Sequence, residues 1–316
     1  MPRKEEFTFP SSTGRDTIHA YLWLPDEGDP RAVLQIAHGI AEHAERYDAF
    51  ARFMADRGFA VAANDHLGHG KSVGENGCLG YFAPEGGWDK AVSDLHALHE
   101  LMAGRFPGAP YILMGHSMGS FLVRTYIIRY PYGLDGCILS GTGWHSAATC
   151  DLGRAMADME ALRIGWQGRS GLVNAMCFGT YNKRCKPCRT NDDWLTRDTA
   201  MVDRYIADPL CGFVPTVSLI KDMLGGIKLI CTAKNLAAMD HTMPVYFFSG
   251  DADPVGSYGS GVTHAYRAFR KAGMSNVRLK LYPGGRHEML NEINRDQVFE
   301  DVSAWLENTI ETGKDA

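Results

Sequence analysis

One serine of this chain lies in a sequence that suits a nucleophile. Gly115-His116-Ser117-Met118-Gly119 is a G-x-S-x-G pattern, in which the glycines permit a tight turn that exposes the serine hydroxyl. The apolar run 111–114 precedes this pattern and helical spacing follows it, so we expect Ser117 between a strand and a helix. A serine in that position can attack an electrophilic carbonyl carbon.

A second G-x-S-x-G match, Gly70-Lys71-Ser72-Val73-Gly74, lacks this context. It follows the turn-like sequence His66-Leu67-Gly68-His69, and no strand directly precedes it. The same residues do not complete a phosphate-binding loop, because that loop needs a glycine five positions before Gly70, where the chain has Asp65. The context therefore favours Ser117 as the nucleophile and argues against nucleotide hydrolysis.

A serine hydroxyl becomes a strong nucleophile when an imidazole accepts its proton and a carboxylate orients that imidazole. His287 follows a predicted strand over 277–282, and Asp251 and Asp253 follow a predicted strand that ends at Ser249. The carboxyl ends of parallel strands meet at one edge of a sheet, and the chain order Ser, Asp, His is typical of this arrangement. We therefore expect Ser117 as nucleophile, His287 as base and one of the two aspartates as the acid.

The reaction also needs backbone N–H groups that bind the negative oxygen formed during the attack. The N–H of Met118 directly follows the nucleophile at the start of a helix. A second N–H is expected from the loop after the strand 32–37, where Gly39 allows close approach of the backbone and Ile40 presents its N–H.

The elements that must position these residues follow from the alternation of apolar segments. Two alternating segments near the N-terminus predict an antiparallel edge, and the later strands alternate with amphipathic helices, which predicts parallel pairing. The predicted fold class is α/β, with a mostly parallel, doubly wound sheet. We expect strands over 5–10, 17–24, 32–37, 59–63, 111–114, 136–139, 244–249 and 277–282, and helices over 44–57, 88–103, 118–129, 258–271 and 296–309.

The alternation stops between Thr142 and about His241, where apolar residues recur at helical spacing without strands. We interpret 142–241 as an inserted helical cap, and 1–141 together with 242–316 as the core domain. A Cys-rich basic segment, 180–189, has no assigned role within the cap. Several apolar cap residues are typical of a core, and an acyl channel is the alternative: Met156, Met159, Leu162, Trp166, Phe178, Leu210, Phe213, Val217 and Met223.

The overall composition is that of an ordinary globular protein. The chain has 32 Lys+Arg against 37 Asp+Glu, a formal charge of −5, and 45% hydrophobic residues. This balance argues against a nucleic-acid partner. Glu5 and Glu6 lie where a signal peptide needs apolar residues, and no apolar run approaches the roughly 20 residues that span a bilayer, so we expect a cytoplasmic protein.

Eight cysteines and twelve histidines raise the question of metal or redox chemistry. Cys185-Lys186-Pro187-Cys188 resembles half of a zinc site, but no second pair follows at suitable spacing. Four histidines, His38, His43, His66 and His69, lack the spacing of metal ligands on one helix face. We expect neither a metal nor a cofactor.

Five segments together resemble the monoacylglycerol lipase and lysophospholipase branch of the α/β-hydrolase superfamily. They are His38-Gly39-Ile40-Ala41-Glu42-His43-Ala44-Glu45-Arg46-Tyr47, Asp65-His66-Leu67-Gly68-His69-Gly70-Lys71-Ser72, Gly115-His116-Ser117-Met118-Gly119-Ser120, Gly250-Asp251-Ala252-Asp253 and Gly285-Arg286-His287-Glu288. The resemblance covers nearly the whole chain outside the cap. It implies an α/β-hydrolase fold with a cap over an acyl tunnel, and cofactor-free hydrolysis of monoacylglycerol-like or lysophospholipid-like esters.

The resemblance also implies roles for single residues. It places the nucleophile at Ser117, the base at His287 and the acid at Asp253, because the family's acid stands three residues after the glycine that is Gly250 here. Asp251 then becomes a turn residue.

The same resemblance places the oxyanion N–H groups at Ile40 and Met118. The rest of the first motif becomes a loop that supports them, formed by His38, Gly39, Glu42, His43 and Arg46.

Alternatives to ester hydrolysis stay open at this stage. Related folds include peptidases of the proline aminopeptidase type, and the same three side chains could transfer an acyl group to an acceptor other than water. A binding module without turnover is a further alternative. The expected partner is a small acyl ester, and the apolar cap residues leave open a transient contact with a membrane surface.

Overall fold

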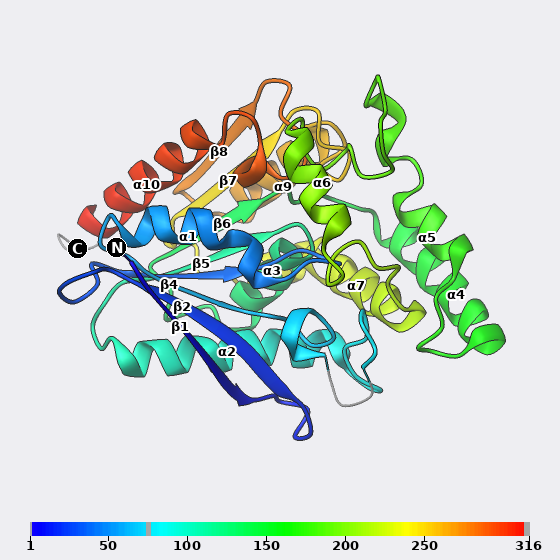
Figure 1. Ribbon diagram of the computed structural model, residues 1–316, viewed down its shortest axis with the longest axis horizontal. Helices are drawn as coiled ribbons and strands as arrows, with labels where there is room; N and C mark the ends of the chain where they lie inside the picture. The colour runs from blue at the N-terminus through cyan, green and yellow to red at the C-terminus, as the bar shows by residue number, and fades with distance from the viewer. Residues whose placement is uncertain (1, 74–76, 313–316) are drawn as a thin grey trace.

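The computed structural model describes residues 2–73 and 77–312 (Figure 1). Residues 1, 74–76 and 313–316 lie outside this range, and with them Gly74 of the second G-x-S-x-G match and the outermost residues of the expected core domain. The described residues form one eight-stranded sheet with the strand order β1-β2-β4-β3-β5-β6-β7-β8. The strands are β1 (Arg3–Pro10), β2 (Thr17–Leu24), β3 (Val33–Ala37), β4 (Ala60–Asn64), β5 (Tyr111–His116), β6 (Gly136–Ser140), β7 (Val245–Gly250) and β8 (Val277–Tyr282).

The sheet has an antiparallel edge and a parallel centre. β1 pairs antiparallel with β2, and β2 pairs antiparallel with β4. All pairs from β4 to β8 are parallel. Every residue of β3, β4 and β5 is buried, as expected for parallel strands that are covered on both faces. The predicted mostly parallel α/β fold is confirmed.

Helices cover both faces of the sheet (Figure 1). Apolar side chains of α1 (Asp48–Ala55) and α10 (Arg295–Thr312) join one buried cluster, which includes Ile112 and Met114 of β5. Apolar side chains of α2 (Gly87–Arg105), α3 (Met118–Arg129) and α9 (Ser260–Lys271) join the cluster on the other face. The alternation of β5 side chains between the two clusters follows from the two-residue period of a strand.

Helices and irregular segments, but no strand, lie between β6 and β7, a stretch that the structure describes throughout. The helices are α4 (Ala147–Ile164), α5 (Gly171–Phe178), α6 (Thr199–Ala207), α7 (Val217–Ile230) and α8 (Ala233–Leu236). α7 packs against both α4 and α3, and its apolar side chains belong to the same buried cluster as those of α3. α4 and α5 lie at the end of the molecule away from α10 (Figure 1).

Two segments that carry site residues are single short turns. η1 (Ala44–Tyr47) begins directly after His43, and η4 (Met289–Asn291) follows Glu288. In the part of the chain that the structure describes, no helix combines the length and the apolar character needed to cross a bilayer.

Candidate active site

Ser117 lies in the turn between β5 and α3. Its backbone has φ +52° and ψ −122°, a region that residues other than glycine rarely adopt. The two glycines of the motif make room for this turn, because a Cβ atom on Gly119 would lie 2.0 Å from the carbonyl oxygen of Ala37, and one on Gly115 would lie 2.4 Å from the carbonyl oxygen of Gly119. The close packing of α3 on β3 and β5 therefore holds Ser117 in its strained conformation.

His287 and Asp253 form a buried pair. His287 Nδ1 lies 3.0 Å from Asp253 Oδ1, and their side chains are 2% and 0% exposed. Asp253 is held in turn by the N–H of Val255 and by the hydroxyl of Ser249, at 2.8 and 3.0 Å. Burial alone would lower the pKa of His287, but the charge of Asp253 and its hydrogen bond outweigh burial and raise that pKa above its usual value.

Asp251 has a different environment from Asp253. Its side chain accepts a hydrogen bond from the N–H of Gly284 at 2.7 Å and is exposed. Asp251 therefore closes the turn beside β8 and lies away from the imidazole of His287. This geometry supports the assignment of the acid to Asp253.

The imidazole of His287 faces the cavity that contains Ser117. Both residues line that cavity, and Asp253 occupies Nδ1, so Nε2 is the ring nitrogen left for the serine hydroxyl. The rings of His116 and Trp194 lie close to the imidazole of His287, with centroids 4.6 and 5.0 Å from its own. Burial and the neighbouring His287 lower the pKa of His116 to about 4, so His116 is neutral at neutral pH.

The loop after β3 lies against Ser117. A Cβ atom on Gly39 would be 3.2 Å from the Cβ of Ser117 and 2.7 Å from Glu42 Oε1, so only glycine fits without a shift. Ile40 and Ser117 line the same cavities. The N–H of Met118 belongs to the first turn of α3, where N–H groups have no acceptor inside the helix. Both N–H groups can thus be offered to an oxyanion.

Glu42 fixes the shape of this loop. Its carboxylate accepts the N–H of Gly39 at 2.6 Å and the hydroxyl of Tyr47 at 2.9 Å, and it pairs with Arg46. Arg46 also makes a bidentate pair with Glu288, both distances being 2.7 Å. Burial raises the pKa of Glu288, but the charge of Arg46 outweighs it and lowers the pKa to about 2. This network ties the loop to the residue that follows His287.

His38 also supports the loop after β3. Its Nδ1–H donates to the carbonyl oxygen of Gly39 at 2.7 Å, and its Nε2 accepts the N–H of His66 at 2.9 Å. Burial lowers the pKa of His38 well below its usual value, which keeps the ring neutral in this tautomer. His43 lies on the other side, where its Nε2 is 2.9 Å from Asp208 Oδ2.

Two cavities meet at Ser117, and they also share Ile40, Phe178 and Trp194. The larger, about 430 Å³, we call the polar cavity. Its polar lining residues are Glu42, His116, Asn174, Asn182, Asn191, Asp192, His287 and Glu288. The smaller, about 250 Å³, we call the apolar cavity. Its apolar lining residues include Met118, Phe121, Leu152, Met176, Met223, Leu224, Ile227 and Val255.

The sequence favoured core packing for a set of apolar residues in 142–241, with an acyl channel as the alternative. Phe178 and Met223 line the apolar cavity, as the alternative has it, whereas Phe213 lines the polar cavity. The core interpretation is wrong for Met159 and Leu162, which are 70% and 91% exposed on α4. The other members of that set, Met156, Trp166, Leu210 and Val217, do not line either cavity.

Sequence reasoning missed the residues between β6 and β7 that reach the site. Asn174, Asn191, Asp192 and Trp194 come from α5 and from the loop that follows η3 (Tyr181–Arg184). No periodicity or motif marks these residues in the sequence. Only the fold of the cap brings them over Ser117.

Comparison with known proteins supports this description. A family model described as "Serine aminopeptidase, S33" matches residues 28–294. A monoacylglycerol lipase from Mycolicibacterium smegmatis is 30% identical over 286 residues, which are 90% of this chain and 91% of that protein. A human monoglyceride lipase is 26% identical, and the match covers 90% of this chain and 84% of that protein.

A solved structure shows the same fold over nearly the whole chain. A highly thermostable carboxyl esterase from Bacillus coagulans, in complex with glycerol, has a TM-score of 0.90 at 29% identity and covers 97% of this chain and 99% of its own. The fold and these relatives define the class, and the chain is a serine ester hydrolase of the α/β-hydrolase fold. More particularly, the chain belongs to the serine aminopeptidase S33 family, whose model spans most of its length.

Proposed function

We propose that this enzyme hydrolyses monoacylglycerol-like esters through Ser117, His287 and Asp253. The observation that carries the proposal is the buried His287–Asp253 pair beside a strained serine at the junction of a polar and an apolar cavity. The monoacylglycerol lipases among the relatives support the substrate class.

The reaction proceeds in two halves. Ser117 Oγ attacks the ester carbonyl carbon while His287 Nε2 accepts the hydroxyl proton, and the N–H groups of Ile40 and Met118 bind the oxyanion. The C–O bond to the alcohol breaks, and His287 gives its proton to the leaving alkoxide. His287 then takes a proton from water while the water oxygen attacks the acyl carbon. The bond between that carbon and Ser117 Oγ breaks, His287 returns the proton to Oγ, and a carboxylic acid and free Ser117 result. Asp253 orients His287 and stabilises its charged form.

The two cavities suit different parts of the substrate. The apolar cavity suits an acyl chain, because its walls are Met, Leu, Ile and Phe side chains. The polar cavity suits the alcohol, because asparagine and carboxylate groups can hydrogen-bond the hydroxyls of glycerol. The related carboxyl esterase from Bacillus coagulans was solved in complex with glycerol, which supports a glycerol ester as the substrate.

The charge of the polar cavity favours a neutral head group over a phosphate. Glu42, Asp192 and Glu288 line it, and no Lys or Arg is among its described lining residues. Arg46 neutralises part of the charge of Glu42 and Glu288, but Asp192 has no ion pair within residues 2–73 and 77–312. Burial raises the pKa of Asp192, and the carboxylates of Asp193 and Glu288 raise it further. An anionic phosphate would lie in this negative field.

The experiment is a profile of hydrolysis rates over matched long-chain esters. We expect a monoacylglycerol to be cleaved faster than a lysophosphatidic acid of the same acyl length, and Asp192→Asn to narrow the difference by raising the rate on the phosphate ester. Ser117→Ala should abolish all ester hydrolysis while circular dichroism stays unchanged. Retained activity in Ser117→Ala, or a preference for the phosphate ester, would refute the proposal.

Cleavage of an N-terminal amino acid from a peptide is the second candidate. The carboxylates of the polar cavity would attract a free amino group, and the family model carries the name of an aminopeptidase. The apolar cavity argues for an acyl chain instead. Aminoacyl amides in the same panel separate the two candidates. Hydrolysis and acyl transfer both release glycerol, so they are separated by the acyl product, which is a free carboxylic acid after hydrolysis and a new ester after transfer to an added alcohol.

We further infer that residues 142–241 act as a cap that meets lipid surfaces. Leu152, Met159, Leu162 and Leu172 on α4 and α5 are 65%, 70%, 91% and 57% exposed. Leu152 also lines the apolar cavity, so the exposed apolar surface continues into the site. The eight cysteines are all free thiols, which supports a cytoplasmic location as part of the proposal.

A further inference from the structure

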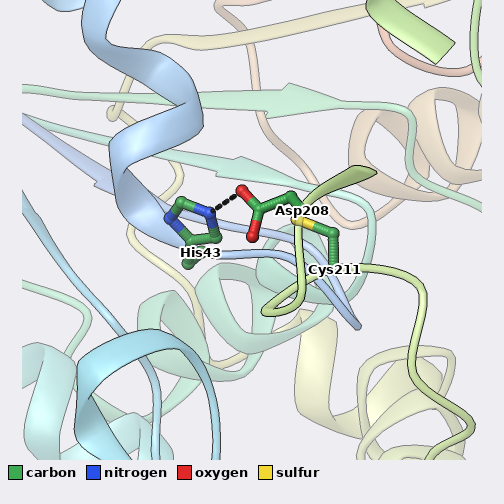
Figure 2. A group of neighbouring side chains, drawn as sticks. All are labelled: His43, Asp208 and Cys211. Carbon is green, nitrogen blue, oxygen red and sulfur yellow. Dashed lines mark hydrogen bonds and ion pairs between the residues drawn. The ribbon is translucent and has the colours of Figure 1, made fainter. Parts of the chain in front are cut away.

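A second group of chemically versatile side chains lies where the cap meets the loop after β3. Figure 2 shows His43, Asp208 and Cys211 pointing toward one another from two different segments. His43 Nε2 is 2.9 Å from Asp208 Oδ2, and the ligand atoms of all three residues lie within 4.8 Å of one another. Asp208 ends α6, and Cys211 follows it in the same turn.

We propose that His43, Asp208 and Cys211 form a binding site for Zn²⁺. Imidazole nitrogen, carboxylate oxygen and thiolate sulfur are the three ligand types that zinc takes in proteins. Around a tetrahedral zinc ion, neighbouring ligand atoms lie about 3.4–3.6 Å apart, as follows from the usual Zn–N, Zn–O and Zn–S bond lengths. The observed separations, 2.9 Å between His43 and Asp208 and at most 4.8 Å within the group, lie on either side of this range.

The surroundings of the three residues suit a bound cation. The thiol of Cys211 makes no hydrogen bond among the described residues and is 8% exposed. Asp208 Oδ1 accepts the N–H of Leu210 at 2.9 Å, which orients the carboxylate in the way that outer partners orient metal ligands. The side chain of Asp208 is 30% exposed, so a water molecule can reach the fourth coordination position.

Binding would exchange a proton for the metal ion. Zinc binds cysteine as the thiolate. When Zn²⁺ binds, the S–H bond breaks, the Zn–S bond forms, and one proton passes to solvent.

The site would join the cap to the loop that presents Ile40. Two contacts already connect them, since the N–H of Gly212 and the hydroxyl of Tyr205 both donate to the carbonyl oxygen of Ala41, each at 3.0 Å. A zinc ion between His43 and Cys211 adds a metal-ligand link to these hydrogen bonds. We therefore expect Zn²⁺ to stabilise the closed contact between α6 and this loop.

The described residues contain one other group of this kind, His96, His99 and Glu100 on α2. There both imidazole Nδ1 atoms hydrogen-bond the hydroxyl of Tyr126, at 2.9 and 2.6 Å, and the group has no sulfur ligand. This group supplies the matched control for the experiment, because metal bound there gives no thiolate signal.

The test uses the full chain with Co²⁺ and Zn²⁺ as probes. We expect one Co²⁺ to bind per chain with a thiolate-to-cobalt charge-transfer band, and Zn²⁺ to displace this Co²⁺. We also expect the melting temperature to rise when free Zn²⁺ is present at about 100 times its Kd. Cys211→Ser should remove the band. Both Cys211→Ser and Asp208→Asn should weaken Zn²⁺ binding by roughly 100-fold or more, because loss of a residue that only hydrogen-bonds a metal ligand already weakens binding by up to about 100-fold. Cys188→Ser and His96→Gln should bind as the parent does.

Each contrary result overturns the proposal. Cobalt bound without a thiolate band places the metal elsewhere, and so does loss of binding in His96→Gln. Unchanged Zn²⁺ affinity in Asp208→Asn would also place the metal elsewhere. This variant keeps the test valid if Cys211→Ser has a lowered melting temperature without metal. Hydrolysis is not the readout, so failure of the proposed function would leave this result unaffected.

Discussion

Asp251 and Asp253 stand two positions apart, yet only Asp253 reaches the imidazole of His287. Asp253→Asn removes the charge that stabilises the imidazolium and orients the ring, so we expect kcat to fall by about 10³–10⁴-fold with little change in KM. Asp251→Asn should lower kcat less than tenfold, because Asp251 bonds only the turn at Gly284. Steady-state kinetics on a soluble short-chain ester measures both. A larger loss at Asp251 would show that the acid was assigned to the wrong residue.

The pH dependence of the enzyme should report His287. The base must be neutral to accept the serine proton, so kcat/KM rises with pH through the pKa of His287. Asp253 raises that pKa above the usual value of about 6.5, and Asp253→Asn should therefore move the acidic limb to lower pH. His116 titrates near 4 and does not contribute in this range. A limb that stays in place in Asp253→Asn would contradict the assignment.

At the scale of elements, the turn η1 and the residues after β8 depend on one buried cation. Arg46 is 10% exposed in its side chain and pairs with Glu42 and Glu288. Arg46→Met leaves two buried carboxylates unpaired, so we expect the free energy of unfolding to fall by about 3–5 kcal/mol and kcat to fall because the loop at Ile40 loses its support. Urea denaturation and kinetics measure the two effects.

Arg52, which lies on α1 directly after η1, offers the matched control. It pairs with Asp48 at 2.7 Å, but the two side chains are 42% and 35% exposed. Arg52→Met should therefore change the free energy of unfolding by at most about 1 kcal/mol and leave kcat unchanged. Equal losses in the two arginine variants would mean that the network around Arg46 has no special role.

Much of this architecture could be predicted from the sequence because apolar runs mark buried strands. Ser117, Asp253 and His287 each follow such a run, and parallel pairing brings the strand ends together, as the structure shows for β5, β7 and β8. The polar cavity could not be predicted, because Asn174 and Asp192 come from cap segments whose paths no periodicity fixes. The His43–Asp208 contact joins residues 165 positions apart, so no local spacing indicates it.

At the scale of the whole molecule, the exposed apolar surface of the cap should govern binding to lipid. Replacing Met159 and Leu162 by Glu puts charge on two of the most exposed apolar side chains of α4. We expect binding to phosphatidylcholine vesicles to weaken about tenfold or more, since burial of one such side chain contributes about 1.5–3 kcal/mol. Co-sedimentation with vesicles measures this.

Ile293 provides the control for the vesicle experiment. It is 63% exposed and lies between η4 and α10, outside residues 142–241. Ile293→Glu should leave vesicle binding unchanged. Equal weakening in both variants would show that lipid contacts are not confined to α4 and α5.

The position of α7 limits how the substrate range of this enzyme can be redesigned. α7 shares its apolar cluster with α3, the helix that follows Ser117, whereas α4 and α5 present many exposed side chains. A chimaera that exchanges the whole insertion with a homologue replaces α7, so its packing against α3 must be matched anew beside Ser117. Grafts confined to 147–207 keep α7 and its packing against α3. Residues 147–207 are therefore the part of the insertion that protein design, or natural divergence, can exchange to alter selectivity.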